Sequence, residues 1–174
     1  MTEFDDHWMT TSTGKKFHYL DPQPEEIDIV DIAHHLSHLC RFTGACKDFY
    51  SVADHSIRVA ELLPHKLRLA GLLHDAAEAY TNDISRPVKY THKLQETETI
   101  IKGAIAKKFW VDFSDPRIKE ADNILIATEA RDLMPNMDGW AELPKPLKDR
   151  ILPSPPFSLV KFTFLYRFRR YMNE

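Results

Sequence analysis

Apolar residues recur every three or four positions through most of this 174-residue chain, which places them on one face of a helix. This spacing predicts helices over residues 25–40, 51–63, 64–80, 93–109, 116–133 and 157–172. Ser51 is a suitable N-cap, and Pro64 and Pro116 fit first helical turns. Strand patterns are scarce, so we predict an all-α fold, a single helical bundle.

The segments between these helices have different compositions. Residues 1–24 contain turn-forming residues without periodicity, which predicts an irregular N-terminal arm, extended or folded as a short hairpin. Residues 81–90 are expected to form a loop against the end of the preceding helix. The proline-rich stretch 135–156 is expected to be an irregular surface connection. We therefore predict one domain with an arm (1–24), a core (25–134), this connection (135–156) and a C-terminal helix (157–174).

Composition and charge exclude several classes of protein. A formal net charge of -3 gives no general affinity for nucleic acid. No apolar run approaches the ~18 residues of a transmembrane helix, and the acidic start does not resemble a secretion signal. Cys40 and Cys46 are too few for a disulfide framework, so we expect a cytoplasmic protein with reduced thiols. A metal site at these cysteines is an alternative, although a second cysteine pair is missing.

Three polar side chains interrupt the apolar stretch from Ala70 to Tyr80. On a continuous helix that turns about 100° per residue, His74, Asp75 and Glu78 fall together, opposite the leucines of the same segment. Gly71 lies on their side and leaves room for another helix or a ligand to approach. We interpret this polar face as part of a binding site.

Two other helices each carry a polar side chain at an apolar position. His55 and Asp122 fall among the inward-facing residues of the helices over 51–63 and 116–133. A buried imidazole or carboxylate without a partner is costly, and a shared divalent ion would satisfy both. The implied metal site is His55, His74, Asp75 and Asp122. For His55 taken alone, a hydrogen bond to a backbone carbonyl in the core is the simpler explanation.

These residues are arranged as H…HD…D on successive helices. Five short segments accompany them: Arg41-Phe-Thr-Gly44, Ser51-Val-Ala-Asp-His55, Leu73-His-Asp-Ala-Ala-Glu78, Arg86-Pro-Val-Lys89 and Lys119-Glu-Ala-Asp122. Together they resemble the HD-domain metal-dependent phosphohydrolases. The similarity is greatest to the single-domain nucleotidase branch, which includes bacterial 5'-deoxynucleotidases and small phage-encoded deoxynucleotide phosphohydrolases such as dATP triphosphohydrolase. It covers about residues 24–133.

The resemblance implies a fold, a cofactor and a set of ligands. The fold would be an HD-domain helical bundle, and His55, His74, Asp75 and Asp122 would hold one divalent transition metal. Nitrogen and oxygen ligands of this kind suit Mn, Co, Zn, Ni or Fe, with Mg as an additional ion, and the sequence does not choose among them.

The resemblance also implies roles around the metal. Glu78 would be the general acid or base, and Arg41 and Lys89 would take part in catalysis by neutralising the phosphate. Lys119 would also reach the phosphate, and Asp83 would contact a sugar hydroxyl or a water. Structural or surface roles are the alternatives for these charged residues. Phe42 and Trp8 are the aromatic candidates for stacking on a base.

The expected activity is hydrolysis of 2'-deoxynucleotides, as mono-, di- or triphosphates, to a deoxynucleoside and phosphate or polyphosphate. The substrate would be a small molecule, without nucleic-acid or membrane partners. A strict 5'-deoxynucleotidase acting on monophosphates is the first alternative. A non-catalytic nucleotide-binding HD protein is the second, and a phosphodiesterase of cyclic dinucleotides or single-stranded nucleic acid is the third.

Two further patterns bear on metal binding and assembly. His34 and His38 are four residues apart and so could form a second metal pair or line the pocket. The helix over 157–172 alternates aromatic and basic residues, which we interpret as a core-packing face with arginines exposed to water. If this aromatic face is too broad for the core of one domain to cover, the uncovered part predicts a subunit interface. We therefore expect a homo-oligomer, either a dimer or a hexamer.

Overall fold

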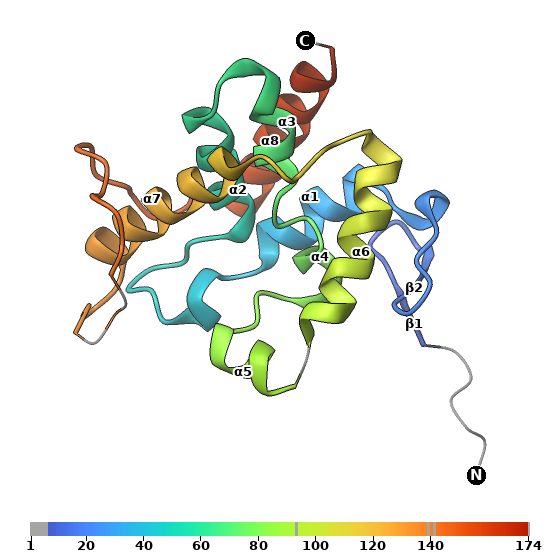
Figure 1. Ribbon diagram of the computed structural model, residues 1–174, viewed down its shortest axis with the longest axis horizontal. Helices are drawn as coiled ribbons and strands as arrows, with labels where there is room; N and C mark the ends of the chain where they lie inside the picture. Colours follow the sequence, from blue (N-terminus) through green and yellow to red (C-terminus); the bar gives the residue numbers. More distant parts are fainter. Residues whose placement is uncertain (1–6, 93, 139, 141, 174) are drawn as a thin grey trace.

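The computed structural model is mostly helical, with a small two-stranded sheet near its N-terminus (Figure 1). It describes residues 7–92, 94–138, 140 and 142–173, with the side chain of Arg86 excepted. The elements in chain order are β1 (Trp8–Thr10), β2 (Lys16–His18), η1 (Pro24–Glu26), α1 (Ile29–His38), η2 (Arg41–Gly44), α2 (Val52–Leu62), η3 (His65–Leu67), α3 (Arg68–Leu73), α4 (Glu78–Thr81), α5 (Arg86–Thr91), α6 (Leu94–Phe109), α7 (Pro116–Leu133) and α8 (Phe157–Met172). Among the described residues, no helix is both long and apolar enough to cross a membrane.

The N-terminal arm contains a β-hairpin that is attached to α1. Strands β1 and β2 pair antiparallel. The carboxylate of Asp31, fully buried on α1, accepts hydrogen bonds from the Ser12 hydroxyl at 2.6 Å and from the Thr13 backbone N–H at 2.7 Å. The hairpin expected as one possibility within residues 1–24 is therefore present, and the first six residues of that range lie outside the described part of the chain.

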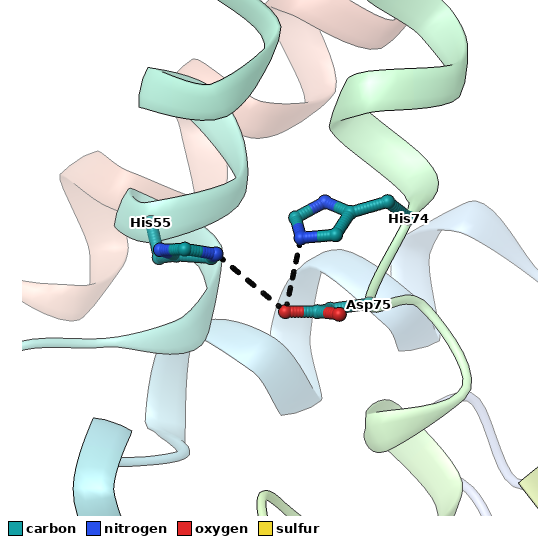
Figure 2. Close-up of side chains that lie close together, drawn as sticks. All are labelled: His55, His74 and Asp75. Carbon is teal, nitrogen blue, oxygen red and sulfur yellow. Dashed lines mark ion pairs between the residues drawn. The ribbon is translucent and has the colours of Figure 1, made fainter. Parts of the chain in front are cut away.

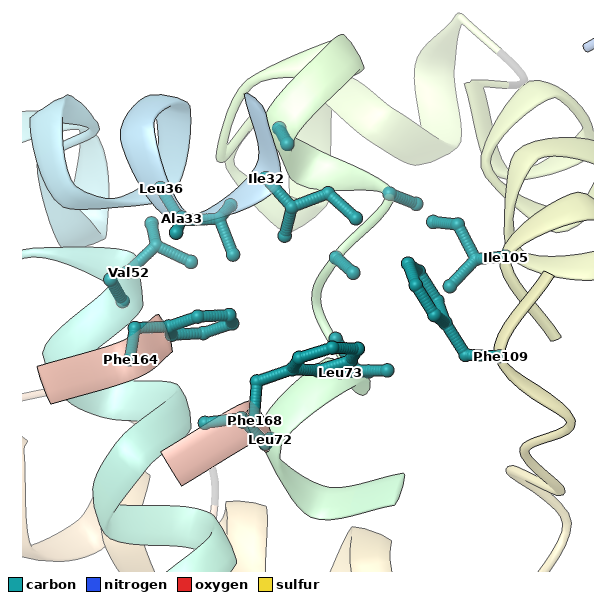
Figure 3. Packing of buried hydrophobic residues seen from close by; sticks show 14 of the residues in the cluster. Ile32, Ala33, Leu36, Val52, Leu72, Leu73, Ile105, Phe109, Phe164 and Phe168 are labelled. Atoms are coloured by element: carbon teal, nitrogen blue, oxygen red, sulfur yellow. The ribbon is translucent and has the colours of Figure 1, made fainter. Parts of the chain in front are cut away.

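The main hydrophobic core joins α8 to helices from earlier in the chain. Phe164 and Phe168 of α8 point into a cluster formed by side chains of α1, α2, α3 and α6 (Figure 3). A second cluster, which includes Val59 of α2 and Leu125 of α7, fixes α7 against α2. Because α2 contributes to both clusters, it holds α3 and α7 in fixed positions relative to each other.

A close approach of α3 to α2 depends on Gly71. A Cβ atom at this position would lie 2.4 Å from Leu63 Cδ1 and 3.1 Å from the backbone Cα of Ala60. The second distance involves backbone, which cannot rotate away as a side chain can, so the side chain of any other residue would separate the two helices. Gly71 therefore brings the end of α3, with His74, toward α2, with His55.

Several predicted helices have the expected bounds. The helices over 116–133 and 157–172 are α7 and α8, and the Ser51 hydroxyl caps α2 by accepting from the Asp54 N–H at 3.1 Å. The helix expected over 93–109 is α6 from Leu94, and Lys93 lies outside the described residues. The predicted bundle is thus largely present, with the two-stranded sheet added to the expected all-α architecture.

Two predictions about where helices lie were wrong. The helix expected from residue 25 begins at Ile29, because the side chain of Asp28 accepts from the Val30 N–H and caps α1 there, after the short η1 turn. The loop expected over 81–90 contains a short helix, α5. Its proline, Pro87, lies within the first turn, where a missing N–H costs no hydrogen bond.

The continuous helix expected over 64–80 was also wrong. It is divided into η3, α3 and α4, with a turn at residues 74–77 between the last two. In an uninterrupted α-helix the Gly71 carbonyl would accept from the backbone N–H of residue 75. Here the imidazole of His74 is hydrogen-bonded to this carbonyl, with Nδ1 2.7 Å from the Gly71 oxygen. His74 and Asp75 consequently lie at the end of a helix, where their side chains project between α2 and α7.

Candidate metal centre

Two imidazoles and a carboxylate converge between α2 and the end of α3. His55 projects from α2, His74 follows the last residue of α3, and Asp75 lies in the next turn (Figure 2). Their potential ligand atoms all lie within 4.8 Å of one another. The Asp75 Oδ2 atom is 3.2 Å from His74 Nε2 and 3.6 Å from His55 Nε2.

Asp122 adds a second carboxylate from α7. Its Oδ1 atom is 3.2 Å from His55 Nε2 and 3.9 Å from His74 Nε2. Ligand atoms bound at 2.0–2.2 Å to one ion lie about 3.0–3.5 Å apart, so these separations are close to those of a coordination shell. The structure therefore brings together all four side chains that the sequence predicted as ligands, and their binding of a metal stays a prediction.

The hydrogen bonds of the two imidazoles leave one nitrogen of each ring facing this point. His55 Nδ1 lies 2.6 Å from Glu129 Oε1, and His74 Nδ1 lies 2.7 Å from the Gly71 carbonyl oxygen. Both partners are acceptors, so each Nδ1 carries the proton when the ring is neutral, and the lone pair is on Nε2. Both Nε2 atoms are buried and make no hydrogen bond. A divalent cation would satisfy both, and the residues present therefore fit a metal.

The electrostatics of the centre also favour a cation. Burial lowers the pKa of His74, but Asp75 and Asp122 outweigh it and raise that pKa to about 10. Burial likewise opposes ionisation of the two carboxyls, and the neighbouring histidines nevertheless keep the pKa of each well below its usual range. Both carboxylates are therefore ionised at neutral pH. A bound metal would replace the protons that the histidines otherwise hold.

Arg41 lies beside this centre and is almost completely buried. Its guanidinium nitrogens lie 3.6 Å from Asp75 Oδ2, 3.7 Å from Asp83 Oδ2 and 3.5 Å from Glu129 Oε2. Burial lowers the pKa of Arg41, and these carboxylates outweigh that effect and raise it above its ordinary value. Arg41 is thus a permanent positive charge at the edge of the centre.

Glu78 and Lys89 form an ion pair close to the same site. Lys89 Nζ is 3.0 Å from Glu78 Oε1 and 2.8 Å from Glu98 Oε1, so two carboxylates hold it. Glu78 Oε2 is buried and has no hydrogen-bond partner. Burial, followed by the charges of Asp75 and Asp83, raises the pKa of Glu78 to about 8. This carboxyl can therefore gain or lose a proton near neutral pH, as an acid or base requires.

The other predicted site residues occupy the rim of the centre. Lys119 Nζ lies 2.6 Å from Asp122 Oδ2 although 61% of the lysine side chain is exposed, so it reaches the centre from solvent. Asp83 accepts a hydrogen bond from the Phe42 backbone N–H at 3.2 Å. Phe42 is half-buried next to Arg41, whose guanidinium carbon lies 5.1 Å from the centroid of the phenyl ring.

Comparison with known proteins places the chain among bacterial relatives. No family model matches it. It is 40% identical over 129 residues to the uncharacterized protein YfdR of Escherichia coli K12, an alignment that spans 72% of each chain. This chain belongs to the YfdR family. An uncharacterized protein of Rhodobacter capsulatus is 42% identical over 91 residues, which cover 47% of this chain and 46% of that protein.

Glu129 is a part of the site that sequence reasoning missed. It is completely buried on α7, and it contacts both His55 and Arg41. It lies seven residues after Asp122, which places the two carboxylates on the same face of one helix. In this member of the YfdR family, the sequence signal for Glu129 was an acidic residue at a position on the inward-facing side of α7.

The alternative metal sites gain no support from the structure. His34 Nδ1 lies 3.2 Å from Lys161 Nζ, an ammonium group that would repel a cation, and His38 Nδ1 lies 2.7 Å from the His34 carbonyl oxygen. Cys40 and Cys46 are free thiols. Within the described part of the chain, the convergent group of possible ligands is His55, His74 and Asp75.

Proposed function

We propose that this protein is a divalent-metal-dependent phosphohydrolase that converts 2'-deoxynucleotides to a deoxynucleoside and phosphate or polyphosphate. The observation that carries the proposal is that the Nε2 atoms of His55 and His74 are buried, make no hydrogen bond and face the carboxylates of Asp75 and Asp122. Such a mixed nitrogen and oxygen set suits Mn, Co, Zn, Ni or Fe. The resemblance of the surrounding segments to HD-domain nucleotidases supports the choice of substrate.

The four side chains would hold the ion, which would supply Lewis-acid activation of a phosphate oxygen and of a water. Arg41 would neutralise the phosphate, and its buried guanidinium lies 3.6 Å from Asp75, one of the proposed ligands. Lys119, whose side chain is mostly exposed, would supply a second charge from the solvent side of Asp122. Together these cations would orient the phosphoester toward the attacking water.

Glu78 is the residue that we propose to move the proton. Its free Oε2 atom has no partner, and the raised pKa of its carboxyl lets it take a proton from water or give one to the leaving oxygen. Lys89 holds the other oxygen, Oε1, at 3.0 Å. In this arrangement Lys89 fixes the orientation of Glu78 and contributes its charge to the phosphate site.

The number of phosphates in the substrate depends on how many cations are available to bind them. Arg41, Lys89 and Lys119 together exceed the need of one phosphate, which supports acceptance of di- and triphosphates. One observation favours the stricter alternative, a 5'-deoxynucleotidase acting on monophosphates. Lys89 is already held by Glu78 and Glu98, so its charge is largely compensated.

A panel of deoxy- and ribonucleotide mono-, di- and triphosphates, assayed with protein loaded separately with each metal, tests the proposal. We expect phosphate or polyphosphate release from deoxynucleotides and its loss in Asp75→Ala with helicity retained by circular dichroism. Asp21→Ala, at an exposed position, is the matched control. Elemental analysis of protein purified without chelators identifies the metal. Undiminished turnover in Asp75→Ala would refute the site, and nucleotide binding without turnover would favour the non-catalytic alternative.

We also propose that the protein assembles as a homo-oligomer, a dimer or a hexamer. Helix α8 buries Phe164 and Phe168 in the core, yet it also exposes Leu159, Phe162 and Tyr166, which recur at helical spacing on another face. Such an exposed apolar stripe is typical of an interface between subunits. Light scattering of the native protein and of Phe162→Asp tests this, because a monomeric native protein would contradict it.

A further inference from the structure

An aromatic pair lies at the edge of the candidate metal centre. The rings of Phe42 and Trp140 are 5.7 Å apart between centroids and meet edge to face at 64°. Phe42 directly follows Arg41, whereas Trp140 comes from the irregular connection 135–156. Both rings are half-buried, and among the described residues neither belongs to the two hydrophobic clusters that form the core. Their contact therefore contributes to a surface near the site.

The backbone holds Phe42 in an unusual conformation at this point. Phe42 and Thr43 have φ values of 53° and 55°, in the left-handed region that non-glycine residues seldom occupy. The Phe42 N–H donates to Asp83, which also lies 3.7 Å from the guanidinium of Arg41. Strain of this kind persists only where surrounding contacts fix it, and it is common at ligand sites. These contacts hold the backbone of Phe42 beside Arg41.

The connection that carries Trp140 is attached near the same loop at both ends. The backbone N–H of Lys47 donates to the carbonyl of Leu133 at 3.0 Å, and that of Ser154 donates to the carbonyl of Phe49 at 3.0 Å. In Figure 1 this connection, in orange, lies next to the segment that follows η2. Trp140 is therefore part of a segment tied to the loop that carries Arg41 and Phe42.

We propose that Trp140, together with Phe42, binds the nucleobase of the substrate by stacking. This inference rests on the proposed function, because it places the 5'-phosphate at Arg41. In a nucleotide the base is separated from that phosphate by one sugar, and the Phe42 ring lies 5.1 Å from the guanidinium carbon. Stacking uses the face that all bases share, so this contact accepts purines and pyrimidines alike. Specificity for a deoxynucleotide over a simple phosphoester then comes partly from the connection 135–156.

Kinetics with matched substrates test this role. Stacking of a base on an aromatic ring corresponds to about 5- to 150-fold in affinity, and we expect the lower part of this range, about tenfold, for a half-buried ring. Trp140→Ala should raise KM for a deoxynucleoside monophosphate by about tenfold with little change in kcat. Trp140→Phe, which keeps an aromatic ring, should bring KM most of the way back to the native value. For 2-deoxyribose 5-phosphate, which lacks a base, KM should be unchanged. Trp110→Ala, at a position that is 87% exposed, is the control.

A fluorescence titration separates this inference from the proposed activity. In Trp8→Phe/Trp110→Phe, Trp140 is the remaining tryptophan of the three in the chain. Deoxynucleoside monophosphates, added with Mg²⁺, should quench its emission, whereas 2-deoxyribose 5-phosphate should not. Quenching without hydrolysis would refute the proposed function and retain a base site. Hydrolysis with no quenching, or an equal rise in KM for both substrates in Trp140→Ala, would overturn the base site alone.

Discussion

The contact of Glu129 with His55 predicts that a residue outside the ligand set controls metal affinity. Glu129 Oε1 lies 2.6 Å from His55 Nδ1, and both side chains are fully buried. The carboxylate fixes the ring with its lone pair on Nε2 and makes that nitrogen a stronger donor to a metal. Glu129→Gln keeps the size of the side chain but removes the charge, and its amide can also turn its NH₂ group toward the ring.

The size of the effect follows from this geometry. Loss of the hydrogen-bonding partner of a metal-binding histidine lowers the affinity for the metal by roughly 10- to 100-fold, or about 1.4–2.8 kcal/mol. We expect the upper half of this range, because the contact is short and fully buried, where water does not screen the charge. The change also leaves Arg41 with one fewer carboxylate, at 3.5 Å, so some loss of thermal stability should accompany it.

Competition with a chromophoric chelator measures the affinity for Zn²⁺ and Mn²⁺ directly. Glu120→Gln makes the same substitution at an exposed position of α7 and should leave the affinity unchanged. Circular dichroism establishes that both variants are folded. If Glu129→Gln binds metal as tightly as the native protein, Glu129 does not position His55. If both variants weaken binding equally, the effect comes from the net charge of the protein.

Three further outcomes are expected. Gly71→Ala should lower stability by about 1–3 kcal/mol, seen as a lower Tm, because the added Cβ would meet Leu63 and Ala60. Gly103→Ala is the control, since its Cβ would meet nothing within 4 Å, and it should raise stability by up to about 1 kcal/mol. Without metal, the pKa of His74 is about 10, against an ordinary value of 6.5. The stability that protonated His74 contributes is therefore complete below pH 6.5 and is lost toward pH 10, so urea midpoints should fall over that range. Metal affinity should rise over the same range, because the metal binds the deprotonated imidazole. Glu78→Gln should lower kcat by about 10²- to 10⁴-fold and leave the metal content unchanged. The control Glu96→Gln, at an exposed position, should change neither kcat nor the metal content.

The helices that could be predicted from sequence are those whose signals are local. Helices α7 and α8 have regular apolar spacing, and Pro116 at the start of α7 and the prolines before α8 mark their beginnings. The cap at Ser51 is equally local, since its hydroxyl reaches an N–H three residues later. The late start of α1 was missed because Glu25 and Glu26 resemble a helix N-terminus, although the cap is Asp28.

The site was predictable where a polar residue occupies an apolar position. His55 and Asp122 break the apolar pattern of their helices, and this indicated that they face a shared partner. Contacts between distant segments gave no such signal. Trp140 meets Phe42 across almost a hundred residues, in a connection without periodicity. Arg41 contacts three carboxylates from separate parts of the chain, and no sequence spacing encodes that arrangement.

The end of α3 explains how neighbouring residues can share one ion. On a continuous helix, side chains at successive positions point about 100° apart and meet only near the helix surface. Here the ring of His74 takes the Gly71 carbonyl, the helix ends, and Asp75 Oδ2 comes within 3.2 Å of His74 Nε2. The same contact fixes the tautomer that leaves Nε2 free, and the missing side chain of Gly71 lets α3 approach α2. Helix termination, imidazole orientation and helix packing therefore have a common origin at Gly71 and His74, so the site depends on both residues although only one of them could bind a metal.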